Sequence, residues 1–202
     1  MPFITYYYKN MRRIIIKFFV IINLVKFKYC NKISYGKRLR VRGPLFLDLK
    51  PNSKLEIGNN FVFASGLNQN PLSRNITGSI RIDEYASINI GDNVGISSSC
   101  LWARCSIIIG NNVKIGADCL ILDSDLHSLN FLHRRDFLLD NVNSFSSAVE
   151  IGNDVFIGAR SIICKGVSIG DRAIIGAGSV VSKNVPCDEI WGGNPIRFIK
   201  SL

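Results

Sequence analysis

No apolar run in the sequence is long enough to cross a membrane. The longest, Ile14–Val25, has twelve residues and contains Lys17 and Asn23, whereas a spanning helix needs about 20. Lys17 and the lack of a small-residue cleavage site after the run also argue against a secretory signal peptide. The six cysteines form no Cys-x-x-Cys pair. We therefore predict a reduced, cytoplasmic protein.

Acidic residues are absent from the first 42 positions, which hold eleven of the 25 Lys and Arg. The remaining 160 residues carry 14 basic and 15 acidic residues, so the net charge of +10 belongs to an N-terminal arm. A nucleic-acid-binding domain more often carries its charge on the folded body, together with a recognisable reading motif. The sequence contains no such motif, and we expect no nucleic-acid partner.

What the sequence does contain is a repeat of six residues. An aliphatic residue occupies positions 151, 157, 163, 169, 175 and 181, and small or short residues follow four positions later. Ten such hexads occur in three runs. Short strands ended by Gly or Asn make a chain that turns every six residues, and its coils must stack to bury their apolar side. Cys100 and Cys119 fall at the fifth position, where we predict small inward-facing side chains.

The hexads, with the closing segments Val180–Pro186 and Gly192–Arg197, resemble the hexapeptide-repeat acyltransferases. The similarity covers roughly residues 50–200 and is greatest to the maltose, galactoside and polysaccharide O-acetyltransferases. It implies a left-handed parallel β-helix with three hexads per coil, a handedness that the usual crossover rule would not give. We predict a basic N-terminal arm with a helix (1–50), the β-helix (51–186) with an inserted loop at about 122–148, and a C-terminal extension (187–202).

The hexads stop after Ile121 and resume at Val149, and both histidines of the chain lie in this interruption. His127 follows Asp123 and Asp125 with the spacing D-x-D-x-H. An imidazole can act as general base in acyl transfer to a hydroxyl, and a carboxylate on its other ring nitrogen orients it. The resemblance implies a catalytic histidine in such a loop, so we predict His127 as the base and either Asp123 or Asp125 as its partner. The alternative is a surface histidine among solvated acids.

Other residues of the loop are less informative. His133 lies in a charged stretch without a supporting pattern, and we expect it at the surface or packed within the loop. Three phenylalanines are predicted to pack the loop on a neighbouring surface, which the resemblance implies is another subunit of a homotrimer: Phe131, Phe137 and Phe145.

The resemblance also implies acetyl-CoA as the acyl donor. Ala159 and Ala177, one 18-residue coil apart, and Ser182 are predicted to contact its pantetheine arm, and Lys183 and Arg197 to bind its phosphates. Small residues also suit the turns of any β-helix, which is the alternative explanation. No P-loop or GxGxxG motif points to ATP or NAD. Two histidines are too few for the three-histidine zinc site of γ-type carbonic anhydrases, and we predict no metal.

From this resemblance we predict an acetyl-CoA-dependent O-acetyltransferase that acts on a sugar hydroxyl in capsule, O-antigen or exopolysaccharide biosynthesis. The alternatives are N-acetylation of an amino sugar or small xenobiotic, and a non-catalytic docking module. The basic arm is predicted to cap the open end of the β-helix, to lie on the anionic inner face of a membrane, or to do both; membrane contact would make the cytoplasmic protein peripheral.

Overall fold

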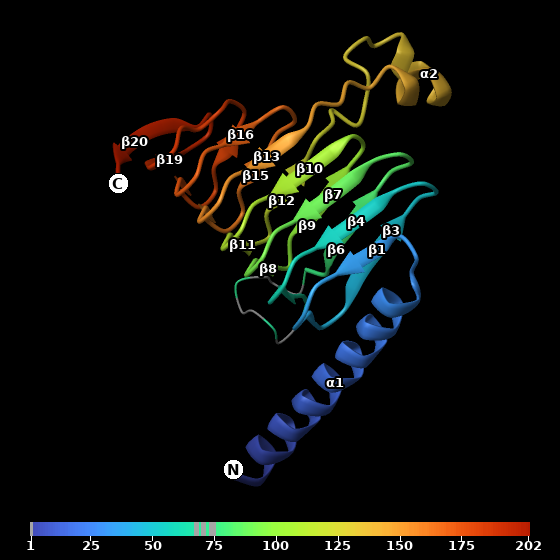
Figure 1. The fold of residues 1–202 in the computed structure, drawn as a ribbon, viewed down its shortest axis with the longest axis vertical. Helices are drawn as coiled ribbons and strands as arrows, with labels where there is room; N and C mark the ends of the chain where they lie inside the picture. The colour runs from blue at the N-terminus through green and yellow to red at the C-terminus, as the bar shows by residue number, and fades with distance from the viewer. Residues whose placement is uncertain (1, 67–68, 70–71, 73–75) are drawn as a thin grey trace.

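The computed structural model describes residues 2–66, 69, 72 and 76–202, and its body is a left-handed parallel β-helix with three sides (Figure 1). Sheet A contains β1 (Ile33–Tyr35), β4 (Lys54–Ile57), β7 (Ser87–Ile90), β10 (Ser106–Ile109), β13 (Val149–Ile151) and β16 (Ser168–Ile169). Sheet B contains β2 (Arg40–Arg42), β5 (Val62–Ala64), β8 (Gly95–Ser97), β11 (Lys114–Ala117), β14 (Phe156–Ile157), β17 (Ile174–Ile175), β19 (Glu189–Gly192) and β20 (Arg197–Ser201). Sheet C contains β3 (Leu45–Leu49), β6 (Gly78–Ile82), β9 (Cys100–Ala103), β12 (Leu120–Leu122), β15 (Ile162–Ile163) and β18 (Val180–Val181).

The hexad repeat sets the register of these sheets, and the predicted fold class is confirmed. Ile151 pairs with Ile169 and Ile157 with Ile175, each one 18-residue coil apart. The repeated aliphatic side chains are buried and form one continuous core. Each coil thus covers the apolar face of its neighbour, as a solenoid requires.

The corner between sheets A and B is held by a ladder of side chains. In each step a backbone N–H donates to the side-chain oxygen of the equivalent residue one coil on, at 2.6 to 2.9 Å. The ladder runs through Asn59, Asp92, Asn111, Asn153 and Asp171. The glycine before each ladder residue allows close stacking of the turns, because a Cβ on Gly110 would lie 2.7 Å from the Gly152 backbone.

The predictions for the two cysteines at fifth positions differ in outcome. Cys119 is fully buried, as predicted, whereas Cys100 lies half-buried on the outer side of β9. Ile96 and Leu101 occupy equivalent inward positions, since they pair with Ile115 and Ile121 in the next coil. Leu101 follows Ile96 by five positions, whereas Ile121 follows Ile115 by six, so Cys100 falls one position out of phase with the repeat.

The N-terminal arm forms α1 (Pro2–Tyr29), and the sheets begin immediately after it. Residues 33–49, which we expected in the arm, already form the first coil. The C-terminal part of α1 packs onto this coil through Phe27, which is 1% exposed, and Asn23, whose Nδ2 donates to the Gly43 carbonyl at 2.8 Å. No helix of the described residues is long and apolar enough to span a membrane.

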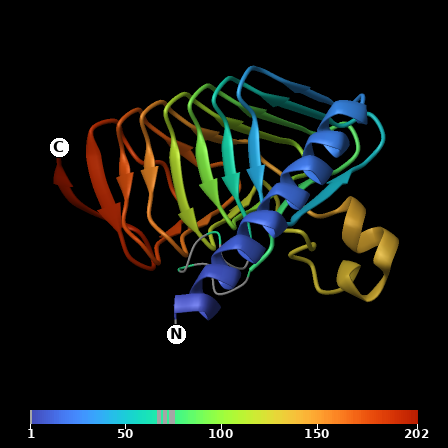
Figure 2. The same cartoon turned by 90° about the horizontal axis from the view of Figure 1, so that it is seen from below.

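The first coil, onto which α1 packs, and the C-terminal hairpin lie at opposite ends of the coil stack (Figure 2). The inserted loop leaves the corner between sheets C and A after β12 and contains the 3-10 helix η2 (His133–Arg135) and α2 (Phe137–Val142). At the other end, β19 extends sheet B and β20 folds back antiparallel to it. The fold therefore presents a loop at one corner and a hairpin at the C-terminal end.

Candidate active site

The loop is anchored at its base by Asp123. This side chain is fully buried, and its two oxygens accept hydrogen bonds from the backbone N–H groups of Arg104 at 2.7 Å and Cys105 at 2.8 Å. Burial raises the pKa of Asp123 above its ordinary value. Farther along the loop, the Asp136 side chain accepts from the Leu139 N–H and caps α2.

His127 pairs with Asp140 of α2. Its Nδ1 lies 2.6 Å from Asp140 Oδ2, and Asp140 Oδ1 accepts from the Ser128 N–H at 2.7 Å. The hydrogen bond from His127 lowers the pKa of Asp140, which keeps the carboxylate ionised. The imidazole is 71% exposed, and its partner carboxylate 14%. With Nδ1–H donated to the carboxylate, Nε2 carries the lone pair of the neutral ring and can accept a proton from a substrate.

The partner of His127 is therefore neither of the two carboxylates that we expected. Asp123 is committed to the loop base, and Asp125 lies 3.0 Å from Lys165 Nζ. Leu126 has φ +62°, which turns the backbone between Asp125 and His127 and separates their side chains. The D-x-D-x-H spacing could not reveal this turn, and nothing in the sequence pattern points to Asp140, 13 residues farther on.

A hollow of about 560 Å³ opens beside His127, between the loop and the outer face of sheet C. Its lining is Lys50, Arg81, Asp83, Glu84, Trp102, Arg104, Leu126, His127, Phe137 and Asn141. It thus combines a candidate base with two aromatic rings, three cations and two carboxylates. The alternation of inward and outward residues in β6 and β9 places Arg81 and Trp102 outside, but the sequence analysis did not connect them with the histidine.

A network of side chains fixes the walls of this hollow. The Trp102 indole N–H donates to Asp83 Oδ1 at 3.3 Å, and the Arg81 guanidinium lies 4.2 Å from the Trp102 ring centroid. Arg104 Nε is 3.4 Å from Asp83 Oδ2, and its Nη1 donates to Ser144 of the loop at 2.7 Å. Arg104 thereby ties the loop to sheet C, and the hollow has a defined shape.

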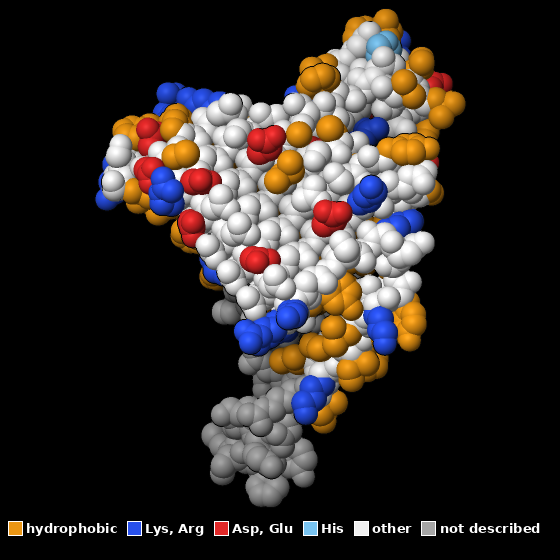
Figure 3. Space-filling view, in the orientation of Figure 1, with side chains coloured by type: hydrophobic (Ala, Val, Ile, Leu, Met, Phe, Trp, Pro, Cys, Tyr) orange, Lys and Arg blue, Asp and Glu red, His pale blue; other side chains and the backbone are white. Residues whose placement is uncertain are grey.

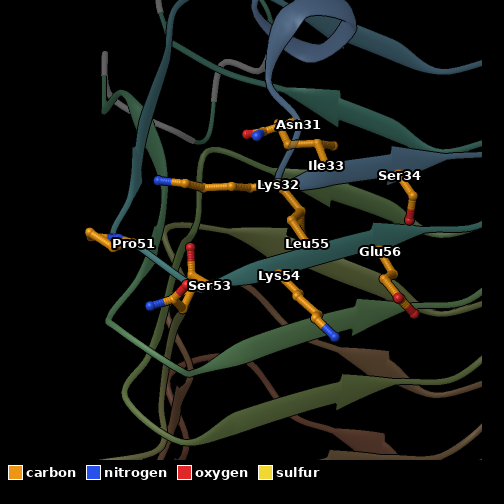
Figure 4. Close-up of a pocket in the computed structure, with 10 residues that line it drawn as sticks. Asn31, Lys32, Ile33, Ser34, Pro51, Ser53, Lys54, Leu55 and Glu56 are labelled. Carbon is orange, nitrogen blue, oxygen red and sulfur yellow. The ribbon is translucent and has the colours of Figure 1, made fainter.

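A larger hollow, of about 680 Å³, lies along β1 and β4 at the N-terminal end (Figure 4). Its Lys32 donates to the Leu49 carbonyl at 2.8 Å, and Lys54 and Glu56 point away from that lysine. This hollow belongs to the first two coils, whereas the loop with His127 leaves the fourth. It contains no histidine or cysteine, and we assign it no chemistry.

The residues predicted to bind the acyl donor lie near the C-terminal end. Ala159 and Ala177 stack in successive turns at the corner between sheets B and C, where the Gly178 N–H donates to the Ala159 carbonyl at 2.8 Å. Ser182 is exposed, and Lys183 Nζ lies 5.1 Å from the centroid of the Trp191 ring. Arg197 is the first residue of β20 and is exposed.

The candidate base and the predicted donor residues lie at different corners of the prism. His127 belongs to the corner between sheets C and A, and Ala159 and Ala177 to the corner between sheets B and C. Sheet C separates the two within one chain. Within the described ranges, no group of three or more His, Cys, Asp or Glu side chains could hold a metal ion.

Residues 148–183 match the model of the hexapeptide repeat of succinyl-transferase. Among solved structures, the chain is 31% identical to a hexapeptide-repeat-containing acetyltransferase from Vibrio cholerae, covering 61% of this chain and 70% of that one with a TM-score of 0.52. It is 26% identical to a maltose O-acetyltransferase from Clostridium difficile 630, covering 85% and 71% with a TM-score of 0.53. A mutant of the N-acyltransferase AntD from Bacillus cereus shares the fold at 20% identity, 89% and 87% coverage, and a TM-score of 0.55.

Proposed function

The chain belongs to the hexapeptide-repeat acyltransferases, and from this premise we propose that it transfers an acetyl group from acetyl-CoA to a sugar hydroxyl. The observation that carries the proposal is the His127–Asp140 pair at the edge of the hollow on sheet C. The similarity to a maltose O-acetyltransferase supports a sugar acceptor. We place the reaction in surface-polysaccharide biosynthesis on the cytoplasmic side of the membrane.

In this mechanism His127 Nε2 takes the proton of the acceptor hydroxyl as its oxygen attacks the thioester carbonyl. Asp140 holds the imidazole in the required tautomer and stabilises the imidazolium that forms. The tetrahedral oxyanion is stabilised by a backbone N–H, and its collapse expels the thiolate of coenzyme A, which takes up the proton. The reaction needs no metal.

The hollow suits a sugar. An aromatic ring such as Trp102 offers an apolar face to the C–H side of a pyranose, and the carboxylates of Asp83 and Glu84 can accept hydrogen bonds from hydroxyl groups. Asp83 is held by Trp102 and Arg104, so its position is fixed before a ligand binds. The lining therefore offers both stacking and hydrogen bonds.

We further propose that the enzyme is a homotrimer with its active sites between subunits. A neighbouring copy would bring its corner with Ala159 and Ala177 to His127, which sheet C prevents within one chain. The loop also exposes large apolar side chains that such a neighbour would cover: Leu129, Phe131, Phe137, Leu138, Val142 and Phe145. Light scattering of the purified protein tests the trimer directly.

The donor is tested by thermal unfolding with and without acetyl-CoA. At 100 times its Kd, a ligand that binds only the folded state adds about 2.7 kcal/mol of stability. We expect a clear rise in Tm with acetyl-CoA and none with ATP or NADH. No shift at millimolar acetyl-CoA contradicts the proposal. Competition between hydroxyl and amine acceptors then distinguishes O-acetylation from N-acetylation of an amino sugar.

A further inference from the structure

One face of α1 is apolar and exposed. Met11, Ile14, Phe18, Ile21 and Val25 are 51% to 65% exposed. At 3.6 residues per turn these positions fall within an arc of about 80°. They form what we call the apolar stripe of α1.

The apolar stripe faces away from the protein body. The buried side chains of the same helix, Asn23 and Phe27, lie on the opposite side of its axis. Both contacts with the body come from the C-terminal part of the helix, while the N-terminal part extends beyond the coils (Figure 1). The side chains of the apolar stripe are therefore not part of the hydrophobic core.

Lysines border the apolar stripe on both sides. Lys17 and Lys28 lie next to one edge and Lys26 next to the other, and all three are exposed. The first 42 residues include no acidic residue that could neutralise them. In the space-filling view, basic and hydrophobic side chains alternate around the described end of α1 (Figure 3). An apolar stripe between cationic edges is the pattern of a helix that lies in the plane of a membrane surface.

We propose that α1 docks the protein on a bilayer surface that contains anionic lipids. The apolar stripe would enter the boundary between headgroups and acyl chains, and the lysines would reach the anionic headgroups. The helix would lie on the surface, because it is not apolar enough to span. A second copy of the chain would be a poorer partner for the apolar stripe. Two such helices would bring lysines of like charge together, and neither helix has an acidic residue to pair with them. The proposal does not depend on the acyl transfer proposed above.

Co-sedimentation with vesicles tests this proposal on the full chain. We expect binding to vesicles of phosphatidylcholine with phosphatidylglycerol, and little binding to phosphatidylcholine alone. The variant Ile14→Ser with Phe18→Ser removes two exposed apolar side chains and should weaken partition roughly 100-fold. Phe46→Ser is the matched control, because Phe46 is 57% exposed on β3 and Phe18 is 59% exposed; it should bind as the parent protein does.

The charges are tested separately. Replacing Lys17 and Lys26 by Gln should weaken partition into anionic vesicles roughly 30-fold, at about one kcal/mol per lysine, and added salt should remove this difference. Replacing the exposed Lys54 and Lys200 by Gln lowers the net charge equally and should have little effect.

The proposal is overturned if the parent protein does not bind anionic vesicles. It is also overturned if the variant with Ile14→Ser and Phe18→Ser binds them as well as the parent does. Concentration-dependent self-association that this variant abolishes, without any vesicle binding, would assign the apolar stripe to a second copy instead. Acetyl transfer to a soluble acceptor should be the same in all these variants, so a failure here is distinguishable from a failure of the proposed function.

Discussion

The coils and the loop after β12 hold their shapes by different means. In the coils the repeated aliphatic residues are buried and stack in register through six turns. Between residues 129 and 148 of the loop, by contrast, no side chain is buried. The loop depends on a few hydrogen bonds made by Asp123, Asp136 and Asp140. We therefore expect a substitution in a coil to lower the stability of the whole protein, and a substitution in the loop beyond its base to change mainly local geometry and activity.

The largest effect is expected at His127. His127→Ala removes the proposed base and should lower kcat about 1,000-fold, as loss of general-base catalysis does. Its Tm should hardly change, because the ring is 71% exposed. Initial rates with acetyl-CoA and a hydroxyl acceptor, combined with a melting curve, check both points.

His133→Ala is the matched control within the same loop. His133 Nδ1 lies 3.1 Å from the Ser128 hydroxyl and has no place in the proposed mechanism. Its variant should keep most of the activity. Full turnover by His127→Ala would make the mechanism wrong, and equal losses in the two variants would point to loop damage.

Two adjacent isoleucines of β10 test whether burial in the coils determines the stability of the protein. Ile107 is fully buried and Ile108 is 41% exposed. Ile107→Ala should lower the free energy of unfolding by about 3 kcal/mol, because it leaves a cavity between coils. Ile108→Ala should cost about 0.5 kcal/mol or less. Urea denaturation of both variants measures the difference, and similar losses would mean that position in the hexad does not decide stability.

The repeat allowed most of the coil architecture to be predicted, because a fixed period determines which residues point inward. The error at Cys100 shows the limit. Ser97 pairs with Ala117, so β8 has no residue opposite Gly116, and the sequence around Ser97 gives no sign of this deletion. A pattern of period six predicts the phase only where the period holds.

The sequence was enough to locate the loop and to identify its histidine. It was not enough to predict which side chains contact one another within the loop. The Asp140 carboxylate reaches His127 only because the backbone turns at Leu126 and α2 folds back. Likewise Trp102 joins the site because β9 lies beside β6 and β12 in successive coils, next to the base of the loop. Such contacts depend on tertiary geometry, which no local spacing encodes.

A third prediction concerns the loop base. Asp123→Asn should cost about 2 kcal/mol, because an amide NH₂ would face a backbone N–H that now donates to a carboxylate oxygen. The variant should also be cut faster by protease within residues 123–148. Asp154→Asn is the control, since Asp154 is exposed and Asn tolerates its φ of +59°. An unchanged free energy of unfolding in Asp123→Asn would show that the loop is not anchored there.

The smallest effect is expected at the partner of the histidine, and it decides between two carboxylates of the same loop. Asp140→Asn keeps the shape of the side chain but removes its negative charge. The variant should lower kcat roughly tenfold, because the imidazolium of His127 loses its stabilising carboxylate. Asp125→Asn should change kcat little, since Asp125 pairs with Lys165. A larger loss in Asp125→Asn would restore the partner that the D-x-D-x-H spacing suggests.

The same pair has a pH signature. The hydrogen bond from His127 holds the pKa of Asp140 below its ordinary value, so its contribution to stability is fully present above about pH 4 and is lost as the pH falls through the lowered pKa. The difference in stability between the parent protein and Asp140→Asn should therefore be present at about pH 5 and shrink as the pH falls below about 4. Melting curves across this range measure it. A difference that persists undiminished well below the ordinary pKa of a carboxyl group would mean that the protonated carboxyl, and not the carboxylate, is the form that holds the loop.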